Sequence, residues 1–163
     1  MNINGLVRFI VVGMVLLLVI SVGVYFLFKP STVSPPNEAD INAIYQVVGE
    51  FGARLKDVGL IAPDQDVITA MDFNLKQLIT DRLYQAFVQD TSRIPGRAAS
   101  SSPWPEGIEI DSVQKLDNTS YTVNGKIILM TSLQAAEGRN AGEKPITLTL
   151  KKVNGTWLVD DVT

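Results

Sequence analysis

Apolar residues continue without a charged residue from Phe9 to Phe28. A helix over these 20 residues would be about 30 Å long, which matches the hydrocarbon core of a bilayer. The run closes with bulky aromatic and aliphatic residues and offers no small-residue cleavage site, which favours an uncleaved anchor over a signal peptide. The sequence therefore predicts a transmembrane helix over residues 9–28.

This helix divides the chain into four parts. We expect a short cytoplasmic tail over residues 1–8, the transmembrane helix, a Pro-rich spacer over residues 29–37 and an extracytoplasmic domain over residues 38–163. Only eight residues precede the helix and more than a hundred follow it, so a signal-anchor with its N-terminus in the cytoplasm is the simplest insertion product. The positive-inside rule, applied to Arg8 and the N-terminal amine against Lys29, favours the same orientation by a narrow margin. We therefore predict a single-pass protein of the cell membrane with its C-terminal domain outside the cytoplasm.

After the spacer, apolar residues recur at helical spacing. Asn37 is a candidate N-cap and Gly59 a candidate C-cap. Asp64–Gln89 predicts one or two further helices, with a bend near Ile79 and with Thr80 as an N-cap. The apolar face of the first helix consists of Ile41, Ile44, Tyr45, Val48, Phe51, Leu55 and Val58.

The apolar period then changes from 3.6 to 2. Ser92–Gly107 is rich in proline, glycine and serine and predicts a loop, and Gln134–Lys144 predicts a polar loop. Asn154-Gly155 is the strongest hairpin signal in the chain. The strand residues are Ile108, Ile110 and Val113, then Tyr121–Met130 with a bulge at Gly125, then Ile146–Lys151, and finally Trp157 and Val159. Helices followed by a four-stranded antiparallel meander predict an α+β fold.

Residues 38–163 resemble the NTF2-like, cystatin-related α+β superfamily. The likeness rests on the long amphipathic helix, the shorter helix pair around Leu78–Leu83, and a sheet that ends in Asn154-Gly155 and Thr156–Val159. The resemblance implies two or three helices packed on a curved four-stranded antiparallel sheet. Membrane-anchored members include VirB8-type assembly proteins of secretion and conjugation systems, and small uncharacterised anchored bacterial proteins are also similar, which implies a role in a cell-envelope assembly.

The charge of the predicted domain argues against nucleic acid as a partner. Removing Arg8 and Lys29 from the 14 basic residues leaves 12 against 17 acidic ones, a net charge of −5. Such a surface repels phosphate backbones. The chain also contains no cysteine and no histidine, which excludes disulfides and the commonest general base.

No catalytic or metal-binding pattern is evident in the sequence. NTF2-like enzymes place an Asp–His or Asp–Arg/Tyr set inside the cone, and without histidine the usual dyad is impossible. The carboxylates, among them Asp160-Asp161, lack the spacing of a calcium loop. We therefore predict a protein that is not an enzyme, with no catalytic residue, metal or cofactor.

Trp104 lies between two prolines and has two interpretations. It either covers the open end of the sheet as part of the core or, with Arg97 nearby, contacts a partner. Our leading hypothesis is a non-enzymatic membrane protein whose outward domain binds other envelope proteins. The alternative is a binding module that holds a small apolar ligand inside the cone, in a pocket lined by Tyr45, Phe51, Phe73 and Tyr121.

Overall fold

The computed structural model describes residues 35–59, 61–97 and 100–163. The predicted tail, transmembrane helix and most of the spacer lie outside these residues. Within the described ranges, none of the helices is both long enough and apolar enough to span a bilayer.

The predicted long helix is confirmed as α2 (Glu38–Arg54), which continues into the 3-10 helix η1 (Leu55–Val58). The Asn37 side chain accepts a hydrogen bond from the backbone N–H of Ala39, so Asn37 is the N-cap that we predicted. Gly59 follows η1 with φ of 71°, a left-handed conformation in which glycine carries no steric penalty. Cap residues readable from the sequence thus mark both ends of this segment.

Two shorter helices follow, α3 (Asp64–Asn74) and α4 (Asp81–Gln89), and a short η2 (Thr91–Arg93) comes after them. The Thr80 hydroxyl accepts from the N–H of Leu83 and caps α4, as predicted. Between the helices the chain pairs in parallel with the last strand at Ile79 and Val159. The predicted bend is therefore a short extended connection that joins the helix pair to the edge of the sheet.

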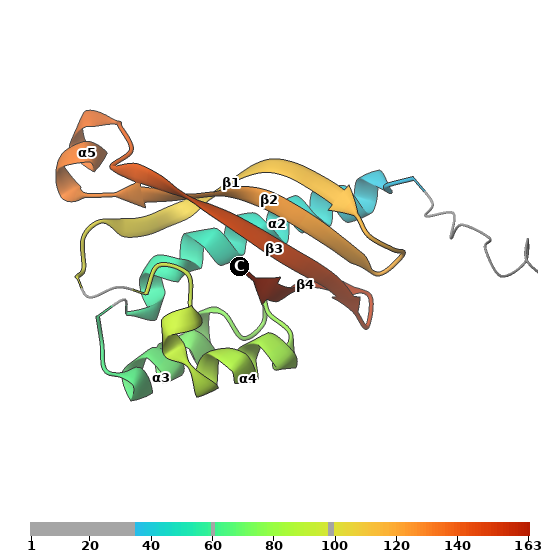
Figure 1. The fold of residues 1–163 in the computed structure, drawn as a ribbon, viewed down its shortest axis with the longest axis horizontal. Coiled ribbons are helices and arrows are strands. Elements are labelled where there is room, and N and C mark those ends of the chain that lie inside the picture. The colour runs from blue at the N-terminus through green and yellow to red at the C-terminus, as the bar shows by residue number, and fades with distance from the viewer. Residues whose placement is uncertain (1–34, 60, 98–99) are drawn as a thin grey trace, which may run out of the picture. The chain divides into compact units, whose positions relative to one another are not determined.

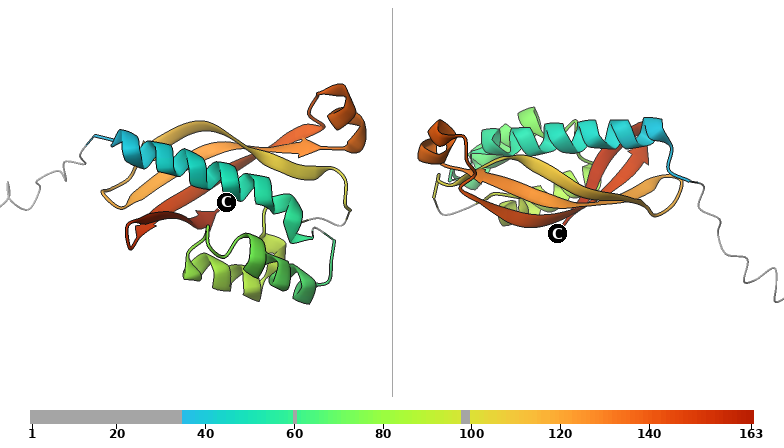
Figure 2. Two further views of the ribbon diagram at one scale, coloured as in Figure 1. Left: turned by 180° about the vertical axis from the view of Figure 1, so that it is seen from behind. Right: turned by 90° about the horizontal axis from the view of Figure 1, so that it is seen from above.

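The four strands form one antiparallel sheet in the order β1-β2-β3-β4, which confirms the predicted meander (Figure 1). The strands are β1 (Trp104–Lys115), β2 (Ser120–Met130), β3 (Gly142–Val153) and β4 (Thr156–Val162). Helix α2 lies along one face of the twisted sheet, α4 lies beside β4, and α3 packs against η1 (Figure 2).

Two predicted loops contain regular structure. The first strand begins at Trp104 rather than at Ile108, because residues from Trp104 onward pair with the end of β2, where Trp104 lies opposite Met130. The predicted polar loop after β2 contains the short helix α5 (Ser132–Glu137). Thr131 caps α5 at its start and Gly138, with φ of 66°, ends it. A helix of six residues is too short to show an apolar period, so its caps are its main signal in the sequence.

The core lies between α2, the sheet and the α3–α4 pair. Its side chains are fully buried or nearly so and come from every one of these elements, for example Phe51, Met71, Phe87, Tyr121 and Leu148. The opposite face of the sheet is polar, and Asn124 accepts from Thr147 (3.1 Å) and donates to Ser112 (3.3 Å) across three strands. This alternation explains the period of 2 in the sequence.

The two glycines inside α2 differ in their surroundings, and this difference generates a prediction. A Cβ at Gly52 would lie 2.6 Å from the backbone nitrogen of Ile108 in β1, whereas a Cβ at Gly49 would meet nothing within 4 Å. Gly52→Ala should therefore lower the free energy of unfolding by about 1–3 kcal/mol through overpacking. Gly49→Ala should raise it by about 0.5–1 kcal/mol through helix propensity.

Chemical denaturation of the full chain in detergent, with both variants in parallel, measures this pair. Equal effects of the two substitutions would contradict the close approach of α2 to β1.

The hydroxyl of Tyr121 generates a second prediction. Tyr121 is fully buried, its ring meets that of Trp157 edge to face at 5.2 Å, and its hydroxyl has no hydrogen-bond partner among the described residues. Removing an unsatisfied buried group costs nothing, so Tyr121→Phe should leave the free energy of unfolding unchanged or raise it by about 1 kcal/mol. A loss of stability in the same denaturation assay would instead mean that a buried water or ligand holds the hydroxyl.

Candidate functional site: a hollow beside Trp104

An open hollow of about 340 Å³ lies where α2 and η1 end and β1 begins. It is lined by Lys56, Asp57, Ile61, Ser101 and Trp104. Trp104 is half-buried, and Ile61 exposes 59% of its surface, which is high for an isoleucine. An aromatic wall, an exposed aliphatic side chain and two charged groups therefore meet at this place.

Glu106 holds two walls of the hollow together. One of its carboxylate oxygens accepts from the indole N–H of Trp104 (2.8 Å), and the other accepts from the ammonium of Lys56 (2.7 Å). The hydrogen bonds from Lys56 and then Trp104 hold the pKa of Glu106 below its ordinary value. Glu106 is the extra residue at a register shift of β1 between Pro105 and Gly107, two residues after Trp104, and from this position its carboxylate reaches the indole.

Arg97 lies beneath the segment that carries Ile61. Its guanidinium donates to the backbone carbonyls of Gly59 (3.1 Å) and Ala62 (2.6 Å) and forms an ion pair with Asp64 (3.2 Å). Its side chain is 16% exposed. We expected Arg97 to contact a partner, but the structure places it within the fold, where it positions the turn before α3.

Trp104 has features of both interpretations, a residue of the core and a residue of an open surface. Its indole N–H is satisfied internally by Glu106, yet the residue lines an open hollow instead of closing the end of the core. Trp104 therefore belongs to the surface that could contact a partner, and its orientation is fixed by the strand that it begins.

The residues predicted to line a ligand pocket do not come together. Phe51 and Tyr121 are fully buried in the core, whereas Tyr45 is 49% exposed and Phe73 is 86% exposed. Helical periodicity misled the prediction at Tyr45, because that position lies beside the buried stripe of α2 rather than in it. The space where we expected a ligand is occupied by the packed side chains of the core.

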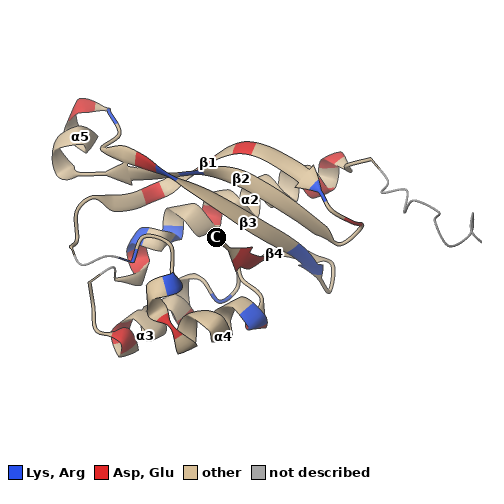
Figure 3. Ribbon diagram, in the orientation of Figure 1, with Lys and Arg blue, Asp and Glu red and all other residues tan. Residues whose placement is uncertain are grey.

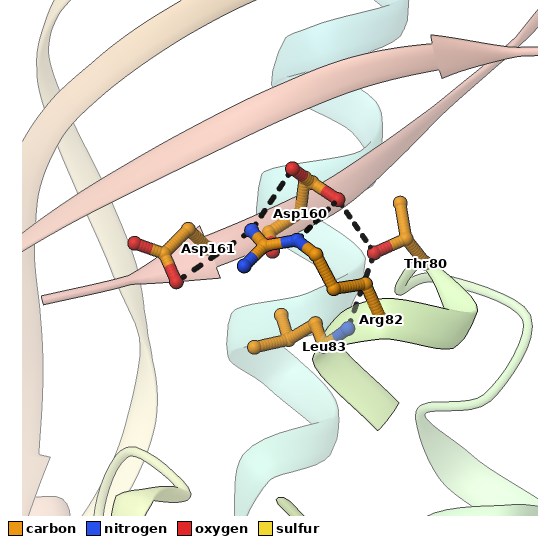
Figure 4. Close-up of polar contacts among 5 residues, drawn as sticks. All are labelled: Thr80, Arg82, Leu83, Asp160 and Asp161. Carbon is orange, nitrogen blue, oxygen red and sulfur yellow. Dashed lines mark hydrogen bonds and ion pairs between the residues drawn. The ribbon is translucent and has the colours of Figure 1, made fainter. Parts of the chain in front are cut away.

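A second polar cluster joins α4 to β4 (Figure 4). Asp160 accepts from the Thr80 hydroxyl (2.7 Å) and from the Arg82 guanidinium (2.9 Å), and Asp161 lies 3.7 Å from the same guanidinium. Burial raises the pKa of Asp160, but the hydrogen bonds from Arg82 and Thr80 outweigh this effect and keep it below the ordinary value. The two aspartates, considered from the sequence as a calcium site, are thus used to attach the helix pair to the sheet.

The start of α2 is attached to the sheet in a related way. Asp40 accepts from Lys152 (2.7 Å) and from the indole N–H of Trp157 (3.0 Å), and the Lys152 ammonium lies 5.4 Å from the centre of the Trp157 ring. These hydrogen bonds, that of Lys152 first, lower the pKa of Asp40. The contact connects the first turn of α2 with the hairpin of β3 and β4.

The charged residues are spread over the domain. Lysine and arginine alternate with aspartate and glutamate across the helices and strands, without a basic band in the described part of the chain (Figure 3). Within the same part, no group of three or more acidic residues is arranged to hold a metal ion.

Comparison with known proteins concerns the fold. No family model and no curated protein matches the chain. A solved structure described as an NTF2-like protein involved in plasmid conjugation is 14% identical, with a TM-score of 0.47 over 82% of this chain and 42% of that one. The chain is similar to NTF2-like proteins. It spans less than half the length of this first match.

Two further solved structures are similar over most of their own length. An NTF2-like protein of unknown function from Shewanella oneidensis MR-1 is 14% identical, with a TM-score of 0.41 over 75% of this chain and 99% of that one. A protein of unknown function from Bacteroides thetaiotaomicron VPI-5482 is 17% identical, with a TM-score of 0.34 over 77% of this chain and 98% of that one. Each of these likenesses is one of fold.

Sequence reasoning missed four residues that line the hollow, Lys56, Asp57, Ile61 and Ser101, and it also missed Glu106, which is hydrogen-bonded to two of its walls. Trp104-Pro-Glu106 offered one signal, because a carboxylate only two residues from an indole is close enough along the chain to accept its N–H. Lys56 and Asp57 carried no such signal, since their role depends on where the end of α2 meets β1.

The Asp160 cluster predicts a pH-dependent contribution to stability. The Asp160 side chain is 15% exposed and accepts from two donors, so Asp160→Asn should lower the free energy of unfolding at pH 7 by about 1 kcal/mol. Because the folded pKa is below the unfolded value of about 3.9, the contribution is complete above about pH 5 and is lost as the pH falls through the folded pKa.

Urea denaturation of both proteins at pH 7 and at pH 3 measures this difference. The difference in free energy of unfolding between the wild type and Asp160→Asn should be smaller at pH 3 than at pH 7. Asp66→Asn, at an exposed carboxylate of α3, is the matched control and should change stability little at either pH.

Proposed function

We propose that this protein is a single-pass membrane protein whose extracytoplasmic NTF2-like domain binds other proteins of the cell envelope. Residues 9–28 serve as the anchor, and the spacer connects it to the domain. The observation that carries the proposal is the hollow beside Trp104. There a tryptophan held in place by Glu106 and the exposed Ile61 line an open surface. Aromatic residues in such positions are typical centres of binding energy in protein interfaces.

The chemistry of the described residues supports a binding role over catalysis. The perturbed carboxylates have internal partners, namely Lys56 and Trp104 for Glu106, and Arg82 and Thr80 for Asp160. Groups that are already paired in the fold are poorly placed to move a proton on a substrate. The packed interior likewise favours a surface interaction over an apolar ligand inside the cone.

The expected outcome is a set of envelope proteins that cross-link to the protein and depend on the hollow. Full-length tagged protein is cross-linked in intact cells, and the co-purifying proteins are identified by mass spectrometry. Trp104→Ala removes a central contact and should weaken the affinity for these proteins by about 30-fold, since truncating a residue at the centre of an interface costs about 2 kcal/mol or more. Ile61→Ala, at an exposed side chain, should weaken capture of the same proteins without affecting the fold.

Phe73→Ala is the matched control, because it removes an exposed aromatic residue from α3, outside the hollow. Hydrogen exchange of each purified variant verifies that the core remains protected. Capture of the bait alone, or equal capture by the wild type and the Trp104 and Ile61 variants, would contradict the proposal.

A further inference from the structure

The charges of the hollow do not cancel. The ammonium of Lys56 is neutralised by Glu106, which also binds the Trp104 indole. Asp57 also lines the hollow, and within the described residues its carboxylate forms no ion pair or side-chain hydrogen bond; its backbone carbonyl accepts from Asn74 (3.2 Å). The hollow therefore has a net negative charge that comes from Asp57.

The same domain twice combines an aromatic ring, a carboxylate and a cation. Lys152 lies over the Trp157 ring with Asp40 as its partner carboxylate. Lys76 lies 4.8 Å from the centre of the Tyr84 ring and is hydrogen-bonded to Asp72 (3.0 Å). A cation beside an aromatic ring and a carboxylate is attracted to both, so the three groups stabilise one another.

The hollow contains two of these three groups without the third. Trp104 supplies the ring and Asp57 the carboxylate, while Lys56 is already held by Glu106. Ile61 adds an exposed aliphatic surface of the kind that covers the methylene stem of a long basic side chain. The acidic balance of the domain favours the approach of a basic partner.

We propose that the hollow receives a lysine or arginine side chain of the partner protein, with its cation between Asp57 and Trp104 and its stem along Ile61. The inference rests on the proposed function, because it names the chemistry that the same surface recognises. It also assigns Glu106 as a positioning residue, which orients Trp104 and neutralises Lys56 so that Lys56 does not repel the incoming cation.

The two tryptophans make the inference testable by NMR on the full chain in detergent. The spectrum contains one indole N–H signal from Trp104 in the hollow and one from Trp157 in the buried contact with Asp40. N-acetyl-arginine methylamide should shift the Trp104 signal in a saturable manner and leave the Trp157 signal in place. N-acetyl-norleucine methylamide, which keeps an aliphatic stem without the charge, should shift it much less.

Asp57→Asn should weaken the apparent affinity for the arginine probe about two- to fivefold, the range expected for an exposed ion pair, and raised salt should weaken it in the same direction. Asp66→Asn is the matched control and should change nothing. In the absence of the probe, Glu106→Gln should broaden or shift the indole N–H signal of Trp104, because the carboxylate that holds the indole is replaced.

Three results would overturn the inference: no response of the Trp104 signal, equal responses to the arginine and norleucine probes, or unchanged affinity in Asp57→Asn. Its failure is distinguishable from failure of the proposed function. Partners that depend on Trp104 in the cross-linking experiment, together with a hollow indifferent to arginine, would retain the interaction role and reject the basic side chain.

Discussion

Helix α2 approaches β1 so closely at Gly52 that a methyl group there would overlap the backbone nitrogen of Ile108. This contact fixes the depth at which the helix lies on the sheet, and its buried stripe then reaches the side chains of β2 and β3. Because η1 continues α2 directly, the same contact determines where Lys56 and Asp57 emerge beside Trp104. The hollow is therefore a consequence of how one helix packs on one strand.

The elements that local chemistry defines could be predicted from the sequence. Asn37, Thr80 and Asn154-Gly155 each mark a boundary through a cap or a turn, and Asn154 and Gly155 have the positive φ values of 51° and 86° that their hairpin requires. Gly125 lies in a continuous β2, and the extra residue of the bulge lies opposite it in β1, between Ile110 and Ser112. The strand periods were sufficient to predict the meander.

The candidate site was predicted less completely because its contacts connect distant parts of the chain. Lys56 meets Glu106 across 50 residues, and Arg97 reaches carbonyls that lie 35 and 38 residues earlier. Neither contact leaves a periodic trace, since each involves one side chain and a partner chosen by tertiary packing. An isolated arginine in a proline- and glycine-rich stretch gave no indication that backbone carbonyls would surround its guanidinium.

The edges of the sheet bear on how the domain can meet other proteins. The edge of β4 is covered where Ile79 pairs with Val159, so Thr80 and Leu78 occupy its backbone groups there. The β1 edge has two register shifts and carries Glu106, Glu109 and Asp111, features that oppose pairing with a further strand. Association through an added strand is disfavoured at both edges, which leaves side-chain recognition as the better-suited mode.

The two tryptophans of the domain show how the same groups can serve the fold in one place and a surface in another. Each donates its indole N–H to a carboxylate that also binds a lysine: Asp40 with Lys152 for Trp157, and Glu106 with Lys56 for Trp104. At Trp157 the lysine also lies over the ring, and the residue is 3% exposed, so the arrangement is complete. At Trp104 the ring borders an open hollow that contains one further carboxylate. The first arrangement stabilises the start of α2, and the second, at the other end of the same helical segment, leaves the Trp104 ring beside an open hollow.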